Sequence, residues 1–169
     1  MSGSSLVKTL CCAAVLAALS GAPIMGQGQG AVDRRDAGGF MVASAESLEP
    51  AGTAGNTVVL GDPTKPGLYV VRNRFLPGRG SRPHYHDQDR LVTVIKGTWW
   101  VHLGPESDTY APEKMTPVKP GGFVLHPAFG HHYDMAKDEE AIVQIIGMGP
   151  VKTTQLEPPG AGRQTAPGQ

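Results

Sequence analysis

The stretch GRGSRPHYHDQDR, residues 78–90, decides the fold that we expect, together with a second stretch from Gly121 to Asp134. The first stretch places His84 and His86 one residue apart, and the second carries His132. Alternate side chains of an extended chain point to the same face, so His84 and His86 are directed at one point, as two ligands of a metal ion must be. His132 can complete such a site only where the sheet closes on itself.

The composition points to a small β-protein. The chain has 169 residues, which is typical of one domain, and its formal net charge is zero, which argues against nucleic-acid binding. Charged residues make up only 18% of the chain, whereas glycine (23) and proline (15) are abundant. This balance disfavours a helical bundle and favours short strands that are joined by tight turns.

Strand signals recur between residues 57 and 148. Runs rich in β-branched and aromatic residues alternate with glycine and proline turns, and no convincing helical period interrupts them. The pattern predicts an all-β barrel or sandwich. The expected strands are 57–60, 68–76, 83–86, 90–95, 99–103, 115–119, 123–126, 131–135 and 141–148.

The N-terminal segment has the features of an export signal. Lys8 precedes an apolar run from Leu10 to Leu19, and small residues follow at 20–22. The run is shorter than the ~20 apolar residues of a membrane span, so we interpret residues 1–25 as a signal peptide that is removed. Both cysteines lie in this segment, so the mature chain has no disulfide. We expect a periplasmic or secreted bacterial protein without a membrane span.

The rest of the chain divides by composition. Residues 26–56 are rich in glycine, alanine and serine and are interpreted as a loose N-terminal arm. The barrel is expected at 57–150. Residues 151–169 are rich in proline, glycine and glutamine and are interpreted as a disordered tail.

Two spaced motifs resemble those of the cupin superfamily. The first motif is Gly, five residues, His-x-His and a later Gly, and the second is Gly, five residues, Pro and a later His. The matching positions are Gly78, His84, His86 and Gly97, and then Gly121, Pro127 and His132. The resemblance covers residues 57–150. It implies a small antiparallel double-stranded β-barrel of the jelly-roll kind, often homodimeric, with a metal near its mouth.

Three positions depart from these motifs. Arg90 stands where the cupin glutamate ligand is expected, Phe129 where the second motif has glycine, and Ala136 where it has asparagine. Arginine has no lone pair to donate and stays protonated, so Arg90 cannot bind a metal and would repel a cation. The neighbouring Asp89 faces the other side of a regular strand, and only a bulge could bring it into the site.

The candidate metal ligands are therefore His84, His86 and His132. Three neutral imidazoles with open coordination positions suit a divalent transition metal: Fe, Mn, Zn, Ni or Cu. Strand alternation also places Asp134 on the inward face beside His132, where it could neutralise Arg90 or act as a further ligand.

Other polar residues are interpreted as structural. His126 and His131 do not stand at ligand positions of the motif, so we expect them to have structural roles or to lie at the rim of the barrel. Of the two, His126 is the first alternative ligand. His102 is expected at the surface. Arg72 and Arg74 share one face of a strand and are either solvent-exposed or part of a basic lining.

Two functions remain open. In the first, an exported cupin binds a metal through the three histidines and could act on a small organic anion, with Arg90 binding its carboxylate or phosphate. Dioxygenation, isomerisation and decarboxylation are implied by resemblance only. In the second, the protein is a non-catalytic, metal-free binder of small molecules with Arg90 in the pocket. Arg90 could also form a plain salt bridge.

Overall fold

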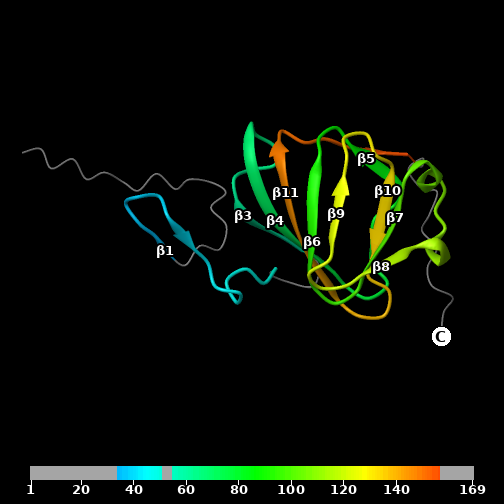
Figure 1. The fold of residues 1–169 in the computed structure, drawn as a ribbon, viewed down its shortest axis with the longest axis horizontal. Coiled ribbons are helices and arrows are strands. Elements are labelled where there is room, and N and C mark those ends of the chain that lie inside the picture. Colours follow the sequence, from blue (N-terminus) through cyan, green and yellow to red (C-terminus); the bar gives the residue numbers. More distant parts are fainter. Residues whose placement is uncertain (1–33, 51–54, 157–169) are drawn as a thin grey trace, which may run out of the picture.

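The computed structural model describes residues 34–50 and 55–156, which include the whole barrel predicted at 57–150 (Figure 1). The predicted signal peptide at 1–25 lies outside the described residues, as does the end of the chain from residue 157. Within the described ranges, no helix is long and apolar enough to cross a membrane.

Two five-stranded antiparallel sheets form the body of the molecule (Figure 1). The order of one sheet is β3 (Gly55–Leu60), β4 (Gly67–Phe75), β11 (Ala141–Gly149), β6 (Arg90–Lys96) and β9 (Phe123–His126). The order of the other is β12 (Thr153–Gln155), β5 (His84–His86), β10 (His132–Met135), β7 (Trp99–Leu103) and β8 (Thr116–Val118). The prediction of an all-β, double-stranded barrel is confirmed.

Smaller elements lie outside these sheets. A two-stranded ribbon of β1 (Arg34–Arg35) and β2 (Met41–Val42) forms in the N-terminal arm. Two 3₁₀ turns, η1 (Pro105–Asp108) and η2 (Pro112–Lys114), lie in the proline-rich connection between β7 and β8.

The core lies between the two sheets because each strand buries one set of alternate side chains. On β6, Val92 and Val94 are buried while Leu91 and Ile95 are exposed. The same cluster includes Trp99 of the opposite sheet, together with buried residues of β4, β9 and β11. This packing fixes which residues of β5, β6, β9 and β10 face the interior, and therefore which of them can meet.

Gly97 explains the last glycine of the first motif. It joins β6 to β7 with a φ of 68°, a conformation that side chains disfavour. A Cβ atom there would lie 1.9 Å from the carbonyl oxygen of Glu140. The turn therefore needs glycine for both its conformation and the space beside it.

The folded part extends beyond residue 150. We expected a disordered tail from residue 151, but Thr153–Gln155 form β12, which pairs with the outer edge of β5. Val151 packs against the core, and Asp87 accepts a hydrogen bond of 2.7 Å from the amide of Lys152. β-Branched threonines are suited to such an edge strand. The addition of β12 gives both edges of β5 a partner strand.

Candidate metal centre

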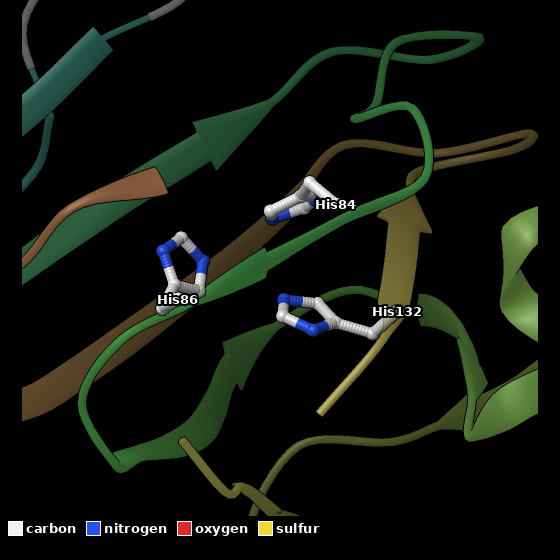
Figure 2. A group of neighbouring side chains, drawn as sticks. All are labelled: His84, His86 and His132. Atoms are coloured by element: carbon white, nitrogen blue, oxygen red, sulfur yellow. The ribbon is translucent and has the colours of Figure 1, made fainter. Parts of the chain in front are cut away.

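The structure brings three histidines from two neighbouring strands together (Figure 2). His84 and His86 project from β5, and His132 projects from β10 directly opposite His84. All three are at most 5% exposed, and one nitrogen of each lies within 4.8 Å of the others. Two nitrogens bound tetrahedrally to one ion at ~2.1 Å lie about 3.4 Å apart. The group therefore comes close to the spacing of a metal site, and its rings must move inward where their nitrogens are more than about 3.4 Å apart.

Backbone carbonyls orient two of these rings. His84 Nδ1 lies 2.7 Å from the carbonyl oxygen of Arg82, and His132 Nδ1 lies 2.8 Å from that of Gly130. A carbonyl can only accept, so each Nδ1 carries the hydrogen and each Nε2 keeps its lone pair. His132 Nε2 is buried and has no hydrogen-bond partner among the described residues. This second-layer support is typical of metal-binding histidines.

The third ring is in contact with Arg90. Arg90 comes from β6 in the opposite sheet, and its Nη1 donates to His86 Nε2 over 2.7 Å. His86 Nδ1 is 3.0 Å from the hydroxyl of Thr153 on β12. Arg90 forms no ion pair with any described carboxylate, so the salt bridge that we considered is not present among these residues. The guanidinium instead occupies the lone pair that a metal ion would use.

The buried histidines are neutral. Burial lowers the pKa of His86 to about 2, and the Arg90 charge acts in the same direction. Burial also lowers the pKa of His132 to about 3, with a further contribution from His84. The pKa of His84 is lowered by burial as well. Neutral imidazole is the form that binds a metal ion, so no proton has to be displaced at neutral pH.

The two acidic residues considered for the site, Asp134 and Asp89, do not join the three-histidine group. Asp134 faces inward, as expected, and its carboxylate accepts a hydrogen bond of 3.0 Å from the Ser81 hydroxyl. Burial raises the pKa of Asp134, while the Ser81 hydrogen bond and the positive charge of Arg90 oppose the shift. Asp89 accepts a hydrogen bond of 2.7 Å from the amide of Ala128 on the exposed side. Neither carboxylate takes the place of the missing glutamate.

His126, which we expected in a structural or rim position and as the first alternative ligand, lies in the interior beside His132. It is 1% exposed, and its ring centroid lies 3.8 Å from that of His132. Neither of its ring nitrogens has a partner among the described residues. Burial lowers its pKa to about 2, followed by the effects of His132 and Arg90. The alternation of β9, with Val124 and His126 inside, is the signal that could have placed it in the interior.

The other histidines lie away from the three-histidine cluster. His131 is at the rim, where it contacts Asp108 and stacks on Tyr85. His102 is half-buried rather than at the surface, because its ring stacks on Tyr133 and its Nδ1 lies 2.7 Å from the Ser107 hydroxyl.

The two arginines of β4 do not extend a basic lining. Arg72 and Arg74 alternate with the core residues Tyr69 and Val71 and therefore lie on the outer face. Arg72 Nε donates to Gln144 over 3.2 Å. Arg74 pairs with Glu49 at 2.8 Å and with Glu140 at 3.2 Å.

Phe129 adopts the backbone conformation of the glycine that it replaces in the second motif. Its φ is 62°, which is unfavourable for a bulky residue. The segment is held because the Phe129 amide donates to the carbonyl oxygen of His86 over 2.6 Å. The loop before β10 is thereby tied to the strand that carries His84 and His86.

Comparisons with known proteins agree with this architecture. No protein-family model matches the chain, and no curated protein matches it. An uncharacterized conserved protein with a double-stranded β-helix domain from Klebsiella pneumoniae is similar, with a TM-score of 0.53 and 23% identity over 69% of this chain and 97% of that chain. A cupin 2 conserved barrel domain protein from Leptotrichia buccalis has a TM-score of 0.50 and 24% identity over 64% of this chain and 48% of that chain.

A further cupin 2 conserved barrel domain protein, from Rhodopseudomonas palustris, has a TM-score of 0.49 and 14% identity, over 60% of this chain and 66% of that chain. The chain thus spans about half to two thirds of the two cupin 2 proteins. At these identities the likeness concerns the fold, which is the one that the two histidine motifs predicted.

Proposed function

We propose, from the premise that this chain is a cupin by fold, that it binds one divalent transition-metal ion through His84, His86 and His132. The observation that carries the proposal is the convergence of three buried, neutral imidazoles. In His84 and His132, Nδ1 donates its hydrogen to a backbone carbonyl, so the lone pair of Nε2 is available to a metal ion. The unpartnered Nε2 of His132 is a buried acceptor that a metal ion would satisfy.

The donor set suits Fe, Mn, Zn, Ni or Cu, because imidazole binds each of these ions. Three protein ligands leave coordination positions open for a small molecule. When bound, such an ion supplies Lewis acidity toward an oxygen atom of that molecule. The protein itself holds the rings neutral, orients them and keeps them away from bulk water.

A small organic anion is the ligand that we propose for the open side. The motif glutamate would have offset part of the charge of the ion, and Arg90 adds a positive charge in its place. A cation beside a guanidinium attracts a carboxylate or phosphate, which arginine recognises with paired N–H groups. The fold does not select a reaction, and dioxygenation, isomerisation and decarboxylation stay candidates by family resemblance.

Export and dimerisation are part of the proposal. The apolar run at 10–19 supports a signal peptide and a periplasmic or secreted location. A homodimer is supported by exposed apolar side chains on the outer face of one sheet, and sedimentation of the purified protein tests it. These side chains are Leu68, Leu91, Ile95, Phe123, Leu125 and Met148.

One observation favours the second function, a metal-free binder of small molecules. Arg90 Nη1 already donates to His86 Nε2 over 2.7 Å. In this function the contact is permanent, so only two imidazoles remain for a metal and the guanidinium is the charged group of a polar pocket.

Elemental analysis distinguishes the two functions. The chain without residues 1–25 and without a histidine tag is incubated with each metal in turn, desalted and analysed. Near-stoichiometric metal that is lost in the His84→Ala/His86→Ala variant supports the first function. The matched control is His102→Ala/His131→Ala, which removes two imidazoles outside the cluster and should retain the metal. Absence of metal from the wild-type protein under every condition supports the second function.

A further inference from the structure

A metal ion on His86 and the observed position of Arg90 exclude each other. The guanidinium Nη1 lies 2.7 Å from His86 Nε2 and uses the lone pair of that nitrogen. A divalent ion at the same nitrogen would be in contact with a positive charge. If the site loads with metal, as proposed above, the Arg90 side chain has to move to another acceptor.

An acceptor lies directly across the strand pair. Arg90 on β6 and His126 on β9 are partners in the antiparallel register, and both are inward-facing positions. Such partners have Cα atoms about 4.5–5.5 Å apart, which a long arginine side chain spans easily. His126 is buried, burial lowers its pKa so that the ring is neutral, and neither ring nitrogen has a partner among the described residues. A neutral imidazole always carries one free lone pair, and here it is unused.

Arg90 also has an unused group. Its Nε is buried and lacks a partner among the described residues. Buried polar groups without partners are rare and costly, and two of them lie on adjacent strands at the same register position. The arrangement is explained if these groups bond to each other in a second state of the site.

We propose that Arg90 has two positions, one on His86 when the site holds no metal and one on His126 when it does. His126 is then a positioning residue: it accepts the guanidinium that metal binding displaces. This inference rests on the proposed function, because it requires a metal on His86. A guanidinium carries five N–H groups, so Arg90 held by His126 still has donors for the carboxylate or phosphate of a bound anion.

A different role for His126 would be that of a fourth metal ligand. Its ring lies 3.8 Å from His132, but its nitrogens do not join the three that lie within 4.8 Å of one another. The two roles differ in one respect that can be measured. A positioning residue affects metal binding only while Arg90 is present, whereas a ligand affects it in any background.

The test is a double-mutant cycle with metal affinity as the readout. Zinc affinity is measured by competition with a chromophoric chelator for the wild type, His126→Leu, Arg90→Met and the double variant. Loss of a hydrogen bond to a charged group predicts about ten- to hundredfold weaker binding for His126→Leu. The double variant should bind zinc as Arg90→Met does. His126→Gln or His126→Asn, which keeps an acceptor, should restore affinity to within about threefold of the wild type in at least one case.

Each outcome decides between the possibilities. Equal weakening by His126→Leu in both backgrounds, or unchanged affinity in the wild-type background, overturns the inference and leaves the proposed function standing. A wild-type protein that binds no zinc overturns both. Should His126→Leu not fold, the ¹⁵N resonances of the His126 ring are followed during zinc titration of the wild type and of Arg90→Met. A shift of the unprotonated nitrogen that requires Arg90 supports the two positions, and the same shift without Arg90 refutes them.

Discussion

Removal of the Arg90 guanidinium should strengthen metal binding. Arg90→Met removes both the positive charge and the donor that lies 2.7 Å from His86 Nε2, while it keeps an unbranched side chain that can fill the interior. The lone pair of His86 then becomes available without any displacement. Arg90→Glu goes further, because it restores the carboxylate ligand that the first cupin motif has at this position.

The magnitude follows from Coulomb's law. Even after moving aside, a guanidinium about 6 Å from a divalent ion is repelled by ~1.4 kcal/mol in a medium as polar as water, and by more in a protein interior. This lower limit corresponds to about tenfold in affinity. We therefore expect at least tenfold tighter zinc binding for Arg90→Met, and tighter binding again for Arg90→Glu.

Chelator competition at fixed ionic strength measures these affinities, and thermal unfolding of each variant verifies the fold. The matched control is Arg72→Met, which removes the same charge from the outer face, where Arg72 bonds to Gln144. It should leave zinc affinity within about twofold. An affinity for Arg90→Met that equals that of the wild type would show that the guanidinium does not compete with a metal for His86, and the reasoning would be wrong.

Three further predictions concern stability. The metal-free protein should lose stability below pH 6.5, because a histidine with a lowered folded pKa stabilises fully above its unfolded pKa and loses this contribution as pH falls toward the folded value. His126, with a pKa of about 2, should account for ~2 kcal/mol of the loss between pH 7 and pH 5 in chemical denaturation. His126→Asn should remove this share and leave the pH dependence that comes from His84, His86 and His132. Phe129→Gly should be about 0.5–1 kcal/mol more stable than Phe129→Ala, since both variants lose the ring but only glycine relieves the φ of 62°. Equal denaturation midpoints for the two variants would show that the backbone of Phe129 is not strained. Gly97→Ala should lower the free energy of unfolding by about 2–4 kcal/mol, because the new Cβ atom meets a positive φ and the Glu140 carbonyl oxygen. A smaller loss of stability would mean that the turn relaxes to accommodate the alanine.

The sequence by itself determined the strands and two of the candidate ligands, because these depend on local rules. Period-two alternation places His84 and His86 on one face of β5, whatever the rest of the chain does. Glycine and proline mark the turns, and the spacing of the two motifs predicted that His132 would return to the same place, as the pairing of β10 with β5 shows.

Only the tertiary structure decided what surrounds those ligands. His126 lies in the opposite sheet, so its approach to His132 depends on how the two sheets pack and not on any spacing along the chain. The motif spacing placed Arg90 at the site, but its hydrogen bond to His86 Nε2 depends on the packing of the sheets as well. The same holds for β12, a three-residue segment that forms a strand because it pairs with the outer edge of β5. Contacts between sheets arise from shape and burial over the whole core, which no local pattern encodes.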